Sequence, residues 1–120
     1  MATRFATAFT GGDVDGVVAL LTDDAWFTMP PATLEYQGPV AIAAFLRSVA
    51  AWRGSRRYRL IPTRANEQPA YGFYMADDGA SSFCSHGLVV LALEGDPISA
   101  ITRFIDNRVV GWFGLPQTLE

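Results

Sequence analysis

The spacing of apolar residues changes its period once along this chain, and that change limits the folds open to it. The first half carries apolar residues at helical spacing, which predicts amphipathic helices. Three such stripes occur: Phe5, Ala8 and Phe9; Val14, Val17, Val18 and Leu21; and Ile42, Phe45, Leu46 and Val49. After the segment "RGSRR" the pattern becomes that of extended strands.

Local signals set the ends of these helices. Asp13 follows two glycines and is expected to cap the second helix, which Asp23 and Asp24 then close. Pro39 stands at the first position of the third helix, where its missing N–H is no loss. Between the second and third helices, "AWFTM" is expected to be a short aromatic strand. It should end at the double proline, because proline has no N–H to donate to a neighbouring strand.

Four strands are expected in the second half. They are "YRLIPTR", "AYGFYMA", "FCSHGLVVLALEG" and "ISAITRFID", and turn-forming residues separate them. Helices followed by consecutive antiparallel strands predict an α+β fold, with the helices on one face of a curved sheet. The 120 residues are enough for one domain, so residues 1–120 are expected to form a single unit.

Charge and composition exclude some functions. The net charge of −3 argues against direct nucleic-acid binding, which relies on a positive surface. No apolar run is long enough to cross a bilayer, and the N-terminus lacks the pattern of a secretory signal, so no membrane association is expected. The single cysteine, Cys84, suits a reducing compartment, and a cytoplasmic location is expected.

The chain lacks the glycine-rich and nucleophile motifs of several large enzyme classes. Cys84 and the only histidine, His86, lie two residues apart on one strand face and could share a metal ion. The plainer interpretation, a wall histidine beside a buried thiol, is favoured because no third ligand is evident. We therefore expect no metal site and no cofactor.

Two polar segments each have two interpretations. The arginine cluster Arg53, Arg56, Arg57 and Arg59 is a solvated connection or, alternatively, a docking patch for an acidic partner. In "RANEQP", Arg64 and Asn66 offer donors that could orient a polar group of a ligand. They could equally satisfy local backbone in a strand connection.

The segments "MPP", "PTRANEQPA" and "FGLP", with the pattern around them, resemble the SnoaL-like domain at the C-terminus of bacterial extracytoplasmic-function sigma factors. This domain is a branch of the nuclear transport factor 2-like superfamily, which also holds ketosteroid isomerase, polyketide cyclases and limonene epoxide hydrolase. The resemblance covers nearly the whole chain. It implies a cone of strongly curved antiparallel sheet, closed by three N-terminal helices around an internal pocket.

We expect such a pocket to bind a small apolar or aromatic ligand. Its expected lining comes from the aromatic strand, the third helix and alternating strand positions. These residues are Trp26, Met29, Tyr36, Phe45, Tyr74, His86 and Phe104, with Arg64 and Asn66 as polar contacts.

The resemblance also shows what this chain lacks. Isomerases of the superfamily carry their catalytic aspartate immediately before the first proline, and here that position is Met29. In the epoxide hydrolases a second aspartate helps activate water, and a rough register places Arg103 there. The weak acid–base candidates that remain are His86, Asp106 and Asp24.

Three hypotheses follow. The first is a noncatalytic ligand-sensing domain in a sigma-factor or RNA polymerase context, and the second is a stand-alone SnoaL-type cyclase, isomerase or hydrolase. The third is a dimerisation module with a vestigial pocket. The chain is either an excised domain or a stand-alone relative. A homodimer through the outer sheet face is expected, because apolar residues occupy both faces of this strand. Val89, Leu91 and Leu93 alternate with Leu88, Val90 and Ala92, so one of the two sets needs cover from beyond the helices.

Overall fold

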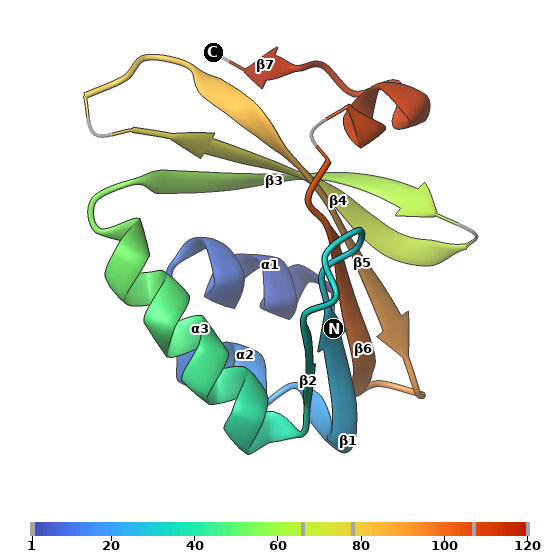
Figure 1. Ribbon diagram of the computed structural model, residues 1–120. Coiled ribbons are helices and arrows are strands. Elements are labelled where there is room, and N and C mark those ends of the chain that lie inside the picture. Colours follow the sequence, from blue (N-terminus) through green and yellow to red (C-terminus); the bar gives the residue numbers. More distant parts are fainter. Residues whose placement is uncertain (1, 66, 78, 107, 120) are drawn as a thin grey trace.

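The computed structural model describes residues 2–65, 67–77, 79–106 and 108–119. Two helices, two strands and a third helix make up the first half, and strands dominate the second (Figure 1). The elements are α1 (Ala2–Thr10), α2 (Val14–Val18), β1 (Leu21–Thr28), β2 (Glu35–Gln37), α3 (Pro39–Arg53), β3 (Arg57–Ala65), β4 (Gln68–Ala76), β5 (Phe83–Leu93), β6 (Ile98–Phe104), the 3-10 helix η1 (Val109–Phe113) and β7 (Thr118–Leu119).

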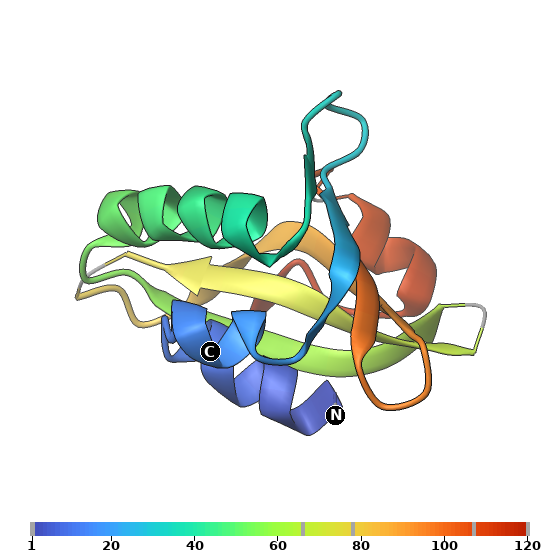
Figure 2. The same cartoon turned by 90° about the horizontal axis from the view of Figure 1, so that it is seen from below.

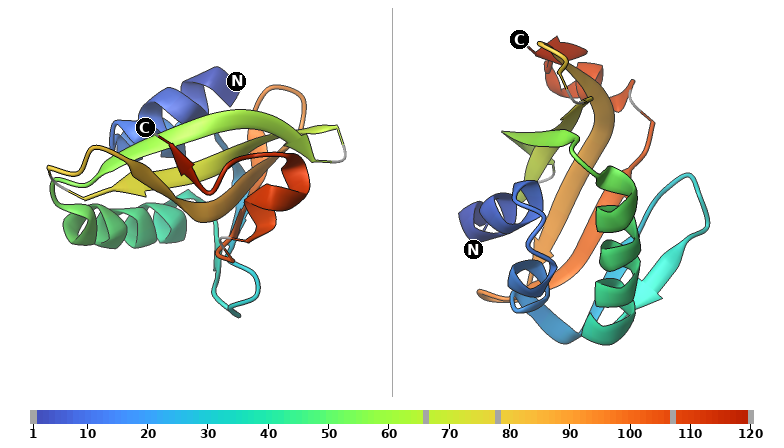
Figure 3. Two further views of the ribbon diagram at one scale, coloured as in Figure 1. Left: turned by 90° about the horizontal axis from the view of Figure 1, so that it is seen from above. Right: turned by 90° about the vertical axis from the view of Figure 1, so that its left-hand side faces the viewer.

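The strands of the described residues form one bent sheet in the order β2-β1-β6-β5-β4-β3, and β7 pairs with β5. The three α-helices lie on one side of the bend, whereas η1 and β7 lie on the other (Figure 1). Seen from below, α3 and the α1–α2 pair lie side by side under the sheet (Figure 2). Figure 3 shows the curvature of the long strands from two further sides. The α+β fold with helices on one face of a curved sheet is thus confirmed.

The sheet is mixed, which corrects the expected antiparallel arrangement. Strands β1 and β6 run parallel, with Phe27 beside Ile101 and Thr28 beside Thr102. The other strand pairs among the described residues are antiparallel. Residue periodicity indicates which residues form strands but carries no information on the direction of a neighbour far along the chain, so this pairing could not be expected.

The second helix is shorter than expected, and β1 is longer. Asp13 does cap α2, since its Oδ1 accepts from the N–H of Gly16 at 2.9 Å. The helix nevertheless ends at Val18, and Asp23 and Asp24 belong to β1. The reason is pairing across the sheet: the N–H of Ile98 donates to the carbonyl of Leu20 at 2.8 Å, which fixes this segment as extended chain. Pro39 begins α3 as expected.

The concave face of the sheet and the three helices share one hydrophobic core. Phe5 of α1, Val17 of α2 and Ile42 of α3 are almost fully buried against Phe27 and Leu91 of the sheet. Burial of such side chains contributes about 1.5–3 kcal/mol each. None of the helices among the described residues is long and apolar enough to span a bilayer.

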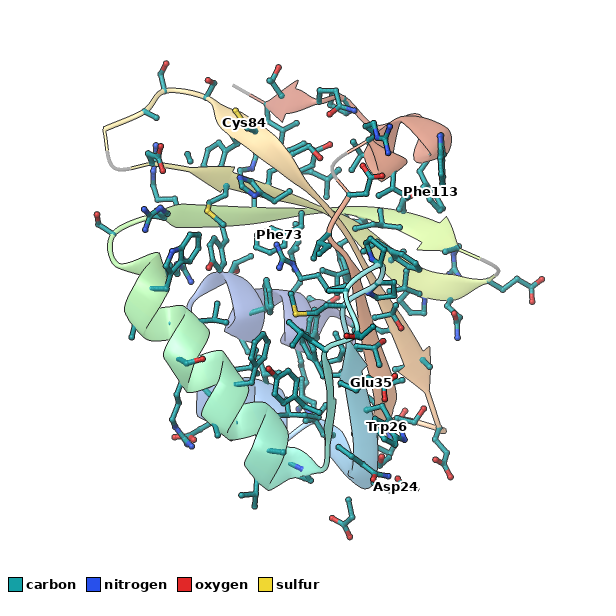
Figure 4. All side chains as sticks on the ribbon, in the orientation of Figure 1. Asp24, Trp26, Glu35, Phe73, Cys84 and Phe113 are labelled. Carbon is teal, nitrogen blue, oxygen red and sulfur yellow. The ribbon has the colours of Figure 1, made fainter. Side chains whose placement is uncertain are left out.

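The opposite sheet face is covered by the C-terminal segment of the same chain. Leu88 and Val90 pack against Val109 of η1, with Phe113 and Leu115 at the edge of this cluster. Figure 4 shows Phe113 and the core residue Phe73 on opposite sides of the sheet. The C-terminal segment of the same chain therefore covers Leu88 and Val90, so these residues do not need a second protein molecule to bury them.

Candidate functional site

A cavity of about 170 Å³ opens between α3, α1 and the concave face of the sheet. It is close in volume to an apolar protein cavity of about 150 Å³ that binds one benzene molecule. Its described lining residues are Phe9, Phe27, Met29, Phe45, Leu46, Val49, Trp52, Tyr58, Phe73, Met75, His86 and Arg103. Most of this wall is aromatic or aliphatic, so the space suits a single ring.

Phe73 lies at the centre of the sheet side of the wall. It stands on β4 between Tyr71 and Met75, whose side chains share the concave face by the alternation of a strand. The ring of Tyr58 meets it edge-on, with the centroids 4.9 Å apart, and Phe9 of α1 does the same at 5.3 Å. These edge-to-face contacts hold a rigid aromatic surface.

Helix α3 supplies the opposite wall. Phe45, Leu46 and Val49 lie on the stripe that the sequence predicted, and all three line the cavity. Phe45 is fixed from behind by Tyr36, whose ring stacks on it at 4.4 Å between centroids. Phe27 contacts it from β1 at 5.4 Å.

Met29 directly follows β1, with its side chain in the cavity wall and only 9% exposed. The peptide bond between Pro30 and Pro31 is cis. The carbonyl of Pro30 accepts from the N–H of Ile105 at 3.1 Å, which ties this loop to the end of β6. Met29 presents a thioether where a proton-transferring group could stand.

Arg103 brings a positive charge to this apolar space. Its Nη2 donates to the carbonyl of His86 at a long 3.4 Å, and its guanidinium carbon lies 4.7 Å from the centroid of the Phe73 ring. Its Nε is buried and has no hydrogen-bond partner among the described residues. Burial lowers the pKa of Arg103, while the neighbouring Tyr58 hydroxyl acts in the opposite direction.

His86 reaches the cavity because strand β5 is irregular at Gly87. The register between β4 and β5 shifts between the pairs Gly72–Leu88 and Tyr74–Ser85, which leaves one extra residue in β5. Burial, followed by the charge of Arg103, lowers the pKa of His86, and Asp77 offsets part of the shift. The imidazole is therefore neutral at neutral pH.

Tyr58 completes the polar part of the wall. Burial raises the pKa of its hydroxyl, although Arg53, Arg103 and Arg56 each act to lower it. The guanidinium carbon of Arg53 lies 3.8 Å from its ring centroid. With a neutral phenol, a neutral imidazole and one guanidinium, the described wall holds no carboxylate. It can donate hydrogen bonds and attract negative charge.

A second, open hollow of about 440 Å³ adjoins the cavity. Trp52, Met75 and His86 line both spaces. On the outer side lie Arg56 and Asp77, which form an ion pair at 3.3 Å.

The structure brings together three of the residues expected from the sequence. Met29, Phe45 and His86 line the cavity. Tyr36 lies one layer behind, against Phe45. Asn66 falls outside the described residues.

Four other expected residues lie elsewhere. Trp26 is on the opposite face of β1 from Phe27 and is 41% exposed, and Figure 4 shows it far from Phe73. Arg64 donates to the carbonyl of Glu67 at 3.1 Å in the β3–β4 turn. This is the second interpretation given for Arg64, a hydrogen bond to local backbone.

Tyr74 is buried under the C-terminal segment and donates to the carbonyl of Pro116 at 2.6 Å. Phe104 packs with Leu88 on the outer face.

The candidate acids also lie outside the cavity wall. Asp106 pairs with Arg108 at 2.8 Å, and this hydrogen-bonded pairing lowers the pKa of Asp106 to about 2. Asp24 is exposed on β1, where it accepts from the hydroxyl of Thr22 at 2.9 Å. Among the described residues, no three His, Cys, Asp or Glu side chains gather as metal ligands.

The expected lining omitted Arg103 and Phe73, although the resemblance to epoxide hydrolases placed Arg103 at the position of a water-activating aspartate. Arg103 shares the concave face with Ile101, two residues earlier, and pairs with the buried Val89. Strand alternation from Ile101 would have indicated this, because a residue two positions along lies on the same face. The aromatic Phe104 was expected in the wall instead.

Comparison with known families gives one match over most of the chain. A family model described as the SnoaL-like domain matches residues 2–101.

One curated relative is a sigma factor. The chain is 37% identical over 117 residues to the ECF RNA polymerase sigma factor SigG of Mycobacterium tuberculosis. The alignment covers 97% of this chain and 31% of that protein, so the chain spans about a third of the relative's length.

Solved structures share the fold at low sequence identity. A cystatin-fold protein from Novosphingobium aromaticivorans aligns with a TM-score of 0.67 at 19% identity, over 84% of this chain and 92% of that one. A candidate ketosteroid isomerase from Kribbella flavida aligns with a TM-score of 0.69 at 16% identity, over 86% and 73% respectively. Identity this low supports the fold alone.

Proposed function

This chain belongs to the SnoaL-like domain family, and we propose that it is a regulatory domain that binds a small, largely apolar molecule. The observation that carries the proposal is the cavity of about 170 Å³, whose described wall is mostly aromatic and aliphatic and holds no carboxylate. Such a space favours burial of an apolar ring. It offers little to a reaction that needs a carboxylate base.

The likeness to a sigma factor supports a role in transcription. We infer that ligand occupancy, sensed between α3 and the sheet, is passed to a sigma factor or to RNA polymerase. Binding there would change the packing of α3, because Phe45, Leu46 and Val49 form one wall of the cavity. This role would place the protein in the cytoplasm, and the net charge of −3 fits a contact with protein rather than with DNA.

A stand-alone enzyme of the SnoaL type is the second candidate function. The observation that favours it is the neutral imidazole of His86 in the cavity wall, in the same space as the hydroxyl of Tyr58. A neutral imidazole can accept a proton, and a phenol can donate one. A cyclase, isomerase or hydrolase would use this pair.

The binding proposal is tested by filling the cavity. Val49→Phe adds a ring at a wall position of α3, and Val40→Phe adds the same ring to the same helix at a residue that is 86% exposed. Toluene should raise the melting temperature of the unmodified protein and of Val40→Phe, because a ligand of the folded state stabilises it. Val49→Phe should lose this response. If toluene leaves the melting temperature of all three proteins unchanged, the cavity is not a binding site for a single ring.

A further inference from the structure

We propose that the cavity selects ligands that carry a carboxylate, bound by the guanidinium of Arg103 while a ring lies against the aromatic wall. This inference rests on the proposed function, since it names the chemical class of the molecule that the cavity binds. It assigns the specificity of the site to a residue that stands on β6, beside Val89 of β5.

The donors of Arg103 are largely unused. A guanidinium offers five N–H groups. The described contacts use one of them, in a bond of 3.4 Å to the carbonyl of His86, which is longer than a usual N–H···O bond of about 2.7–3.2 Å. Nε is buried and has no partner in the described part of the chain. A buried donor left in this state costs stability, so an acceptor at this point would stabilise the folded protein.

The charge of Arg103 is also uncompensated. The ion pairs among the described residues join Arg47 to Asp15, Arg56 to Asp77 and Arg108 to Asp106. None of them includes Arg103, and the face of Phe73 is the aromatic surface that meets it. The other titratable groups of the described wall, His86 and Tyr58, bring no negative charge at neutral pH. A cation in a largely apolar cavity attracts an anion more strongly than it would in water.

A carboxylate on a ring satisfies both features. Its two oxygens match the planar fork of a guanidinium, which favours paired, charge-assisted hydrogen bonds. The neighbouring rings of Phe73, Phe9 and Tyr58 provide the surface for the apolar part. The volume of about 170 Å³ is that of one ring with a small substituent.

The test compares three probes at matched ionic strength by calorimetry and thermal shift: benzoate, toluene and acetate. Benzoate should bind the unmodified protein more tightly than toluene does, and acetate should bind much more weakly. In Arg103→Met the affinity for benzoate should fall about tenfold to a hundredfold, because a charge-assisted hydrogen bond is lost, while toluene binding stays within about twofold. Arg64→Met, which removes an arginine outside the cavity, is the matched control and should bind benzoate normally.

A second measurement needs no variant. The protein has one histidine, so a single imidazole signal can be titrated by NMR. The charge of Arg103 helps to lower the pKa of His86, so bound benzoate should raise that pKa and bound toluene should not.

Several results would overturn the carboxylate proposal. If toluene binds and benzoate binds no better, the cavity is a binding site and the proposed function stands without it. Equal losses of toluene and benzoate in Arg103→Met would show that Arg103 only shapes the cavity. A shift by acetate as large as that by benzoate would show that the ring contributes nothing. If no probe binds, the proposed function falls as well.

Discussion

A methyl group on the Cα of Gly87 would lie 1.8 Å from the carbonyl oxygen of Phe104 on the neighbouring strand. Gly87 also has a φ of +102°, which other residues rarely adopt. It lies in the irregular part of β5, and this irregularity lets both His86 and Val89 face the concave side. The close approach of Gly87 and Phe104 therefore fixes the position of His86.

Gly87→Ala should destabilise the protein by about 3 kcal/mol or more, because it adds a backbone clash to an unfavourable φ. Gly95→Ala is the control: Gly95 has a φ of +68° and open space around it. That variant should lose only about 1 kcal/mol, the cost of the left-handed conformation. Urea denaturation measures both. Equal losses would mean that the contact with Phe104 does not constrain β5.

The parts of the fold that depend on local pattern could be expected from the sequence. The cap by Asp13, the start of α3 at Pro39 and the stripe of Phe45, Leu46 and Val49 all follow from spacing and side-chain chemistry. These features involve neighbours within a few residues. The four strands of the second half follow in the same way.

Features that depend on distant partners could not be expected. Leu21 was expected at the end of a helix, but it is the first residue of β1 because it pairs with Ile98 of β6. The extra residue at Gly87 breaks the alternation that a count along β5 assumes. The outer cluster that receives Phe104 exists because η1 folds back over β5. Because the position of η1 could not be expected from the sequence, Phe104 was a better candidate for the cavity wall than Arg103.

His86 should make stability depend on pH. Its pKa in the folded protein is below the ordinary 6.5, so the unfolded chain binds the proton more readily. Stability is then lost as the pH falls from 6.5 through the lowered folded value, and no further loss from this group follows below it. Asp106, with its pKa of about 2, titrates well below this window.

Denaturation at about pH 7.5 and about pH 5 measures the effect. The unmodified protein should lose more stability between the two than His86→Gln does. In Arg103→Met the imidazole pKa should rise part of the way to its ordinary value, since burial, the larger cause, remains. The same loss in His86→Gln as in the unmodified protein would show that another group is responsible.

We predict that a homodimer forms through the outer face and uses the exposed ring of Trp26. Trp26 pairs with Ala100 of β6, and Ala100 pairs with Ala92 of β5, so two small residues flank the ring on the side away from the cavity. We expect light scattering at micromolar concentration to show a dimer, and Trp26→Glu to show a monomer, because a charge would be buried at the interface. Trp112→Glu, at an 82% exposed site on η1, should stay dimeric. A monomeric unmodified protein contradicts the prediction.

The last prediction concerns Met29, the residue that the sequence resemblance aligns with the catalytic aspartate of the isomerases. Its side chain lies in the cavity wall, where a base would face the ligand, but a thioether cannot accept a proton from the ligand. Proton transfer by a placed base contributes about two to four orders of magnitude in rate. We therefore expect the unmodified protein to convert a Δ5-ketosteroid at the background rate, followed by the ultraviolet absorbance of the conjugated product. Met29→Asp places a carboxylate in the same wall and should raise that rate. An enzymatic rate in the unmodified protein that His86→Ala abolishes would show that the imidazole already acts as the base, and it would favour the enzyme over the binding domain.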